Sequence, residues 1–205
     1  MSRSQPIESS PPGRRFSRGA NGLLRIAASL LALFSVLLSA DHGNCGAEPS
    51  LSEYQVKALF LFNFAKYIDW PSTAFPDTNS PIVIGIVGEN NFGSHLRKTV
   101  EGRSISGRGI VIRENVKEED FDKCHILFIS ASERKHIGEV CNRVKAAPVL
   151  TVGETEQFTQ QGGVIGFIKK EGKVRLQIDL GAARKASLQI SSKLLSVADS
   201  VSSKP

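Results

Sequence analysis

The sequence is poor in the residues that build metal centres and disulfide frameworks: its 205 residues include three cysteines, four histidines and one tryptophan. So few cysteines exclude a disulfide-rich miniprotein. The potential zinc ligands Cys124, His125, His136 and Cys141 show no C-x-x-C or H-x-x-x-H spacing, and adjacent residues of a strand point to opposite faces. We therefore expect no metal site and no cofactor.

The sequence also has no apolar run long enough for a comfortable membrane span, which needs about 20 residues. Its longest uncharged run covers 15 residues, 26–40, and follows a stretch rich in Pro, Ser and Arg. This arrangement is typical of a cleaved secretory signal. We predict a signal peptide over residues 1–47, with cleavage after Ala47 or Ala40, and an exported domain over residues 48–205. An uncleaved anchor and acylation of Cys45 are the alternatives.

Charge of one sign is not strongly in excess. The formal net charge is +6, from 26 basic and 20 acidic residues, and half of it lies in residues 1–47. The predicted exported domain thus carries only +3, which removes most of the support for a nucleic-acid partner. A hydrophobic content of 40% is enough for a real core and excludes wholesale disorder.

Residues 53–69 (EYQVKALFLFNFAKYID) contain neither Gly nor Pro, and they predict a helix. Ser52 precedes them as an N-cap, with Gln55 at the third helical position, as in a capping box. Apolar residues occur nearly all round this helix, so it has to be covered on more than one side.

Three phenylalanines fall within five residues of this helix, so at least one ring points away from the face that packs on the sheet. Exposed apolar patches tend to mark interfaces. Our candidates for contact with a partner or with a second copy of the chain are Phe60, Phe62, Phe64 and Tyr67. Burial on two sides within the monomer is the alternative interpretation.

The rest of the chain alternates short β-branched runs with helical segments, which predicts an α/β fold in a single domain. We expect a mostly parallel, Rossmann-like sheet with helices on both faces, ending in an antiparallel hairpin around Lys170-Glu171-Gly172. A final helix is expected over residues 180–198. The expected strands are 82–87, 110–113, 125–129, 148–152, 164–169 and 173–179.

Two sequence patterns suggest chemistry only weakly. Ser132-x-x-Lys135 matches a nucleophile and base pattern, but a serine at the start of a predicted helix is explained as an N-cap. Gly85, Gly88 and Gly93 follow a strand and precede a helix, without the spacing of a dinucleotide-binding loop. We predict no enzymatic activity, and the crevice at the carboxyl ends of the strands is the default place for a small ligand.

The two cysteines of the predicted strand-helix unit are candidates for a disulfide, Cys124 with Cys141. The strand from residue 125 rises about 17 Å, and the helix from 133 to 141 returns about 12 Å. Cys141 should therefore lie near the level of Cys124, and a bridge would stabilise the fold by about 3 kcal/mol. Two buried, unpaired thiols are the alternative.

Six groups of residues, in order through the whole predicted domain, form a recognisable pattern. They are Glu53-Tyr54-Gln55-Val56-Lys57-Ala58, Asn63-Phe64-Ala65-Lys66-Tyr67, Trp70-Pro71, Cys124-His125-Ile126-Leu127-Phe128-Ile129-Ser130, Thr151-Val152-Gly153-Glu154 with Phe158 and Gly162-Gly163, and Ala182-Ala183-Arg184 into Ile190-Ser191-Ser192-Lys193-Leu194-Leu195. On these segments the chain resembles the YfiR-like family of periplasmic proteins. One departure is Asp179, where the family pattern has Asn, which affects a local turn contact.

The resemblance implies a small exported α/β protein without enzymatic activity. It also implies repression of an inner-membrane diguanylate cyclase through the periplasmic portion of that enzyme, with an effect on cyclic-di-GMP and biofilm formation. The expected partner is thus a membrane diguanylate cyclase, and a second copy of the chain, in a homodimer, is the other candidate. A periplasmic carrier or sensor of a small molecule is the alternative function.

Overall fold

The computed structural model describes residues 51–203. The predicted signal segment, its cleavage sites and Cys45 lie outside these residues, as does the predicted domain boundary at residue 47. No helix within residues 51–203 is long and apolar enough to cross a membrane.

The first helix, α2 (Glu53–Tyr67), begins at the predicted capping box. The Gln55 amide donates to the Ser52 hydroxyl over 3.3 Å, and the Ser52 amide donates to the Gln55 side chain over 2.7 Å. The helix ends where β1 (Ile68–Asp69) begins, because β1 pairs antiparallel with β9 (Gln189–Ile190). This two-stranded sheet fixes the end of α2 to the C-terminal part of the chain.

Eight further strands form one sheet in the order β10-β8-β7-β6-β5-β2-β4-β3. Its pairs are parallel except for the β7–β8 hairpin and the short β3–β4 pair, so the predicted α/β fold is confirmed. Beyond the hairpin, β10 adds one short parallel strand. The strands are β2 (Ile82–Val87), β3 (Ser104–Ile105), β4 (Arg108–Arg113), β5 (Ile126–Ile129), β6 (Leu150–Gly153), β7 (Ile165–Lys170), β8 (Lys173–Asp179) and β10 (Ser200–Ser202).

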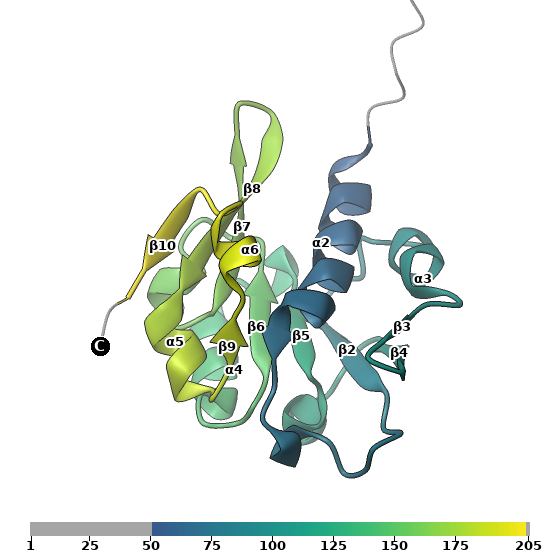
Figure 1. Ribbon diagram of the computed structural model, residues 1–205. Coiled ribbons are helices and arrows are strands. Elements are labelled where there is room, and N and C mark those ends of the chain that lie inside the picture. The colour runs from purple at the N-terminus through teal and green to yellow at the C-terminus, as the bar shows by residue number, and fades with distance from the viewer. Residues whose placement is uncertain (1–50, 204–205) are drawn as a thin grey trace, which may run out of the picture. The chain divides into compact units, whose positions relative to one another are not determined.

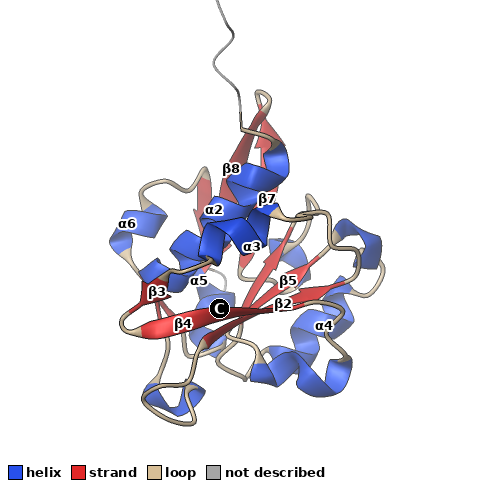
Figure 2. Ribbon diagram, turned by 90° about the vertical axis from the view of Figure 1, so that its right-hand side faces the viewer, coloured by secondary structure: helices blue, strands red, loops and turns tan. Residues whose placement is uncertain are grey.

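Helices cover both faces of this sheet. Figure 1 shows α2, α3 and α6 in front of the sheet and α4 behind it, and Figure 2 shows α4 on the far side of β2 and β5 from α2. The remaining elements are α3 (His95–Val100), α4 (Ile137–Val144), α5 (Leu180–Lys185), α6 (Ser192–Leu195) and the 3-10 turns Ser72–Ala74, Glu118–Lys123, Ala131–Glu133 and Thr159–Gln161.

The central strands β2, β5 and β6 are buried along their whole length, as their unbroken apolar sequences predict. Their side chains alternate between two cores. The core on the α2 face contains Phe64, Phe128 and Phe167, and the core on the α4 face contains Leu127, Ile137 and Phe158. Burial on both faces explains why these strands lack a polar period.

The prediction of one helix over residues 180–198 is wrong. The chain leaves α5 at Ser187, whose φ of 56° is left-handed, and the Leu188 amide donates back to the Ala183 carbonyl. This arrangement ends a helix and turns Leu188 into the core. The chain then runs through β9, the short helix α6 and β10. The even apolar spacing of the segment concealed these breaks, because no Gly or Pro marks them.

Candidate functional site

A buried ion pair holds α2 against the carboxyl ends of the central strands. Lys57 comes from the middle of α2, and Glu154 directly follows β6. The two charged groups are 2.7 Å apart, with side chains 5% and 4% exposed. Charged side chains are rarely buried to this degree unless they are paired, so the pair fixes the position of α2 on the sheet.

Glu154 is surrounded by hydrogen-bond donors on both of its oxygens. Oε2 accepts from the Lys57 ammonium and from the Tyr54 hydroxyl, at 2.7 and 3.1 Å. Oε1 accepts from the Ala131 amide at 3.0 Å and from the Ser130 hydroxyl at 3.5 Å, just beyond β5. One carboxylate therefore connects α2 with the ends of two neighbouring strands.

The network continues to the surface through Glu53. Its carboxylate contacts Lys57 at 2.6 Å and Lys169 of the β7–β8 hairpin at 3.3 Å. Burial lowers the pKa of Lys57, but hydrogen bonds to Glu154 and Glu53 outweigh it, so the pKa lies above its ordinary value. The hydrogen bond from Lys57 holds the pKa of Glu53 below its ordinary value. Lys57 and Glu53 are therefore charged at neutral pH.

The carboxyl edge is where open α/β sheets usually bind ligands. Here the Glu154 carboxylate accepts a hydrogen bond from the Ala131 amide, just after β5. Helix α2 lies over this carboxylate. The Ala131 amide at the end of β5 is therefore already hydrogen-bonded within the protein.

The four aromatic candidates of α2 have different environments. Phe64 is fully buried and stacks on Phe60 and Phe167, with ring centroids 6.0 and 5.9 Å apart, so it is a core residue of the monomer. Phe60, Phe62 and Tyr67 are half-buried. Arg103 lies over the ring of Phe62, and Lys66 lies over that of Tyr67. These three keep part of their surface open, and Phe64 does not.

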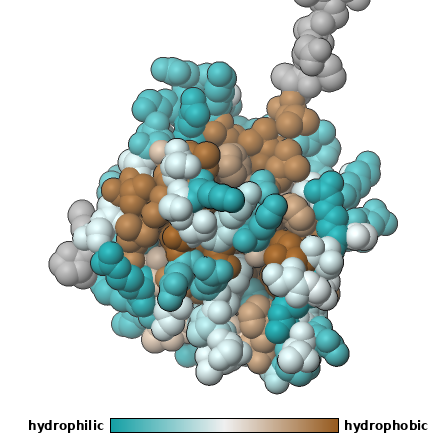
Figure 3. Space-filling model, in the orientation of Figure 1, coloured by the Kyte–Doolittle hydropathy of each residue, from teal (hydrophilic) through white to brown (hydrophobic). Residues whose placement is uncertain are grey.

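Exposed apolar residues extend this surface along α2. Leu51, just before the N-cap of α2, is 57% exposed, and Leu59 within the helix is 38% exposed. Figure 3 shows apolar surface over the start of α2 and a second patch towards the C-terminal segments, where Val197 is 55% exposed. We call Leu51, Leu59, Phe60 and Phe62 the α2 surface.

His125 lies at the opposite, amino ends of the central strands. Its Nδ1 accepts from the Val83 amide at 3.0 Å, so Nε2 carries the proton and donates to the Ala74 carbonyl at 3.1 Å. The ring stacks on Phe75 with centroids 4.4 Å apart. Burial holds the pKa of His125 below its ordinary value. The neutral imidazole therefore fastens the loop before β2 to the sheet.

Cys124 and Cys141 are free, buried thiols in this structure. Cys124 Sγ lies against Gly85 of β2, where an added Cβ would be 2.6 Å away, whereas Cys141 lies beside Gly162 and Thr151 of β6. Strand β5 separates β2 from β6, so the two thiols are displaced sideways across the sheet. The sequence argument considered only their level along the strand, and the predicted bridge is not present here.

Ser132 is not the N-cap of the following helix, contrary to our prediction. Its hydroxyl accepts from the Glu89 amide at 3.0 Å, and α4 begins later, at Ile137. The Ser130 hydroxyl instead caps the intervening 3-10 turn. Ser132 thus joins the loop after β2 to the loop after β5, close to the left-handed Gly88.

Sequence reasoning missed Lys57 and Glu154. Both stand inside the segments that carry the family resemblance, yet each was passed over as an ordinary charged residue. The available signal was Lys57 itself, a lysine within the apolar stretch of α2. Its partner is 97 residues away, so no local pattern identifies it.

Comparisons with known proteins agree with this architecture. A crystal structure of a conserved domain protein from Vibrio cholerae O1 biovar El Tor strain N16961 superposes with a TM-score of 0.51 at 13% sequence identity. The match covers 74% of this chain and 61% of that chain, so this chain spans less than two thirds of its length. At this identity the likeness concerns the fold alone. A search of curated proteins finds no match.

The family model described as YfiR/HmsC-like matches residues 54–199, from the first turn of α2 to the residue before β10. Members of this family are known as periplasmic regulators of diguanylate cyclases. Because the match spans more than half of the chain and includes both partners of the buried ion pair, this chain belongs to the YfiR/HmsC-like family.

Proposed function

We propose that this protein is a periplasmic repressor of an inner-membrane diguanylate cyclase. It binds the periplasmic portion of the cyclase and favours the inactive arrangement of that enzyme, so that cyclic-di-GMP falls. The family match over residues 54–199 is the observation that carries the proposal.

The α2 surface is the proposed contact with the cyclase. Leu51 and Leu59 expose apolar area that the core does not use, and Phe62 adds a half-buried ring. A protein partner gains from covering such a surface, and aromatic residues contribute strongly to such contacts. The buried Lys57–Glu154 pair holds α2 in one place, so the surface is presented without a cost of ordering.

Variants of the exposed positions test this contact. Leu59→Asp and Phe62→Asp place a charge on the α2 surface, and co-purification of the cyclase from envelope extracts should fall by about tenfold or more, since burying an unpaired charge is costly. Val111→Asp is the matched control, because Val111 is also an exposed apolar residue, 42% exposed, but lies on β4. Equal recovery of the cyclase with all three variants would contradict the proposed contact.

A homodimer through the same surface is the second outcome that this experiment can separate. If two copies meet through the α2 surface, Leu59→Asp should convert a dimer into a monomer in analytical ultracentrifugation. Loss of the cyclase with no change in molecular mass would assign the α2 surface to the heterologous partner.

A further inference from the structure

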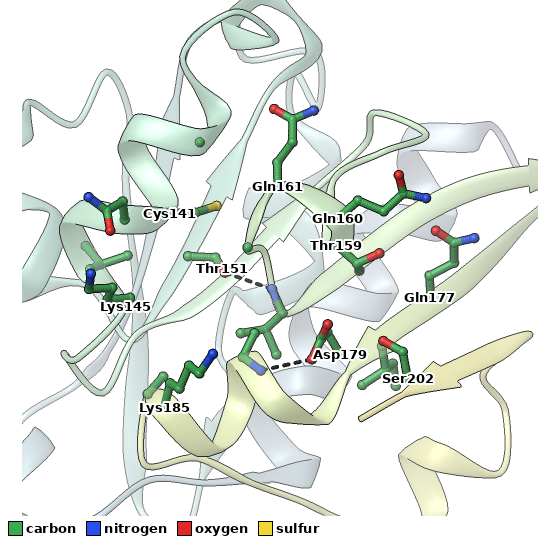
Figure 4. Close-up of a pocket in the computed structure, with 18 of the residues that line it drawn as sticks. Cys141, Lys145, Thr151, Thr159, Gln160, Gln161, Gln177, Asp179, Lys185 and Ser202 are labelled. Atoms are coloured by element: carbon green, nitrogen blue, oxygen red, sulfur yellow. Dashed lines mark hydrogen bonds between the residues drawn. The ribbon is translucent and has the colours of Figure 1, made fainter. Parts of the chain in front are cut away.

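A cavity of about 590 Å³ lies on the face of the sheet opposite α2. It is bounded by α4, α5, β10 and the turn that precedes β7, and it opens to solvent. Figure 4 shows its lining side chains entering from these separate elements. Its volume falls within the range of about 300–1,000 Å³ that is usual for small-molecule sites.

The cavity exists because α4 covers only part of this face. The apolar core beneath α4 consists of residues from β2 and β5 together with Phe121, Cys124, Val149 and Phe158. Phe158 lies against Gly153 and Gly163, where an added Cβ would be 2.2 and 2.0 Å from the ring. Beyond Phe158, β7 and β8 continue the sheet past α4, with the short 3-10 turn Thr159–Gln161 beside β8.

The cavity has a mixed lining, to which the strands contribute polar side chains. Leu176 and Ile178 of β8 face the core on the α2 side, whereas Gln177 and Asp179 alternate with them and face the cavity. Thr151 does the same on β6, between Leu150 and Val152. Val149, Val164 and Ile178 also line the cavity, so it suits a small occupant that carries polar groups on a carbon framework.

Two ammonium groups border the cavity. Lys145 follows the C-terminus of α4, and Lys185 ends α5. Neither forms an ion pair within residues 51–203, where four of the twelve lysines do: Lys57, Lys123, Lys169 and Lys170. Figure 4 shows Lys185, on α5, together with Thr151 and Asp179 among the side chains that line the cavity. Unpaired lysines at a cavity favour an anionic group in the ligand.

The rest of the lining supplies hydrogen-bond acceptors and amides. The Asp179 carboxylate is largely buried, and its Oδ1 accepts from the Ala182 amide at 2.9 Å, so it stays bound at the start of α5. Its other oxygen makes no hydrogen bond to the described residues and can accept from a hydroxyl. Gln161, Gln177 and Ser202 add groups that both donate and accept.

From this combination we infer that the cavity binds a small hydroxylated organic anion, of the class of sugar acids and sugar phosphates. The anionic group would contact Lys145 and Lys185, and the hydroxyls would donate to Asp179 and Gln177. The site lies on the face away from α2, so a ligand here does not compete with contacts of the α2 surface. This inference rests on the cavity and not on the proposed function.

Isothermal titration calorimetry on the purified protein tests the site with four probes. D-glucuronate and 6-phosphogluconate combine an anion with hydroxyls, inorganic phosphate has only the anion, and glucose has only the hydroxyls. We expect saturable binding of at least one hydroxylated anion with a Kd of about 1 mM or tighter. We expect weaker binding of phosphate and none of glucose.

Variants assign the binding to the cavity. Lys145→Met with Lys185→Met should weaken binding of the hydroxylated anion by about tenfold or more, and the corresponding pair of Lys→Arg changes should retain it. Lys98→Met removes an exposed lysine from α3, on the other face, and should leave affinity unchanged. Both targeted lysines are exposed, so equal thermal unfolding temperatures should confirm that the fold is intact.

Three results would overturn the inference. The first is the absence of saturable binding by both hydroxylated anions. The second is equal binding by phosphate and by the hydroxylated anions, which would reduce the site to a general attraction between charges. The third is unchanged affinity in the double Lys→Met variant, which would place the binding elsewhere on the protein.

Discussion

The two faces of the sheet are covered to different extents. On one face, α2, α3 and α6 enclose a continuous apolar core, and a buried ion pair fixes α2 over the ends of the strands. On the other face, α4 covers the central strands, and the half towards β8 and β10 stays open. The closed face therefore presents a rigid surface on its outer side, while the open face offers a cavity.

This difference distinguishes the two binding surfaces proposed above. The outer side of α2 suits a protein partner because its apolar residues are exposed and held in place. The cavity suits a small ligand with polar groups because Thr151, Gln177 and Asp179 line it and two lysines without an ion pair among the described residues border it. The predictions below test how far the two faces differ, in order of expected effect.

The first prediction concerns the closed half of the α4 face. Burial raises the pKa of Cys124 to about 11 and that of Cys141 to about 12, so both thiols are protonated at neutral pH. In native protein we expect iodoacetamide to modify these residues at least about a thousandfold more slowly than in protein unfolded in urea, since reaction needs opening of the fold. Peptide mass spectrometry without reductant measures both rates. Failure of unfolded protein to react without reductant would show that the two cysteines are bridged.

The second prediction contrasts the packing of the two faces. Phe64→Ala should lower the free energy of unfolding by about 3–5 kcal/mol, because Phe64 is fully buried between Phe60 and Phe167. Gln177→Ala, on the floor of the cavity, should change it by less than about 1 kcal/mol. Urea unfolding measures both. Similar losses in the two variants would mean that the cavity floor is packed as tightly as the core.

The third prediction concerns the buried ion pair that holds α2. Lys57→Met leaves Glu154 buried without its counter-charge and should cost about 3 kcal/mol in urea unfolding. Adding Glu154→Gln should recover part of this loss, because the remaining buried group is then neutral. If the double variant lost more free energy of unfolding than the two single variants lost together, a direct ion pair would be contradicted.

The fourth prediction is a smaller, pH-dependent effect of His125 on stability. The pKa of His125 is lowered by burial from an ordinary value of 6.5, so the unfolded chain takes up the proton more readily than the folded protein. The stability that neutral His125 contributes is complete above about pH 6.5. It is lost as the pH falls through the pKa of His125 in the folded protein. The urea midpoint of the wild type should thus fall more steeply below pH 6.5 than that of His125→Gln. Parallel curves would rule out this role for His125.

Local patterns in the sequence were enough for most of the fold. The unbroken β-branched run at 82–87 predicted a doubly buried strand, and Ser52 with Gln55 predicted the start of α2. The C-terminal segment was predicted wrongly because pairing of β9 with β1 and of β10 with β8 overrides its helical spacing.

The sites were harder to predict because they depend on distant contacts. Lys57 and Glu154 are joined only when α2 crosses the end of β6. The cavity combines Lys145 with Lys185 from separate helices, and its size depends on which strands α4 leaves uncovered. No spacing along the chain contains that information, whereas Phe62 could be chosen from the crowding of aromatic residues in one helix.

The most direct test of the central claim is the cellular level of cyclic-di-GMP after deletion of this protein. The account predicts a rise on deletion, a return to the original level with the wild-type protein or with Val111→Asp, and no return with Leu59→Asp. An unchanged level of cyclic-di-GMP on deletion would contradict repression of a diguanylate cyclase by this protein.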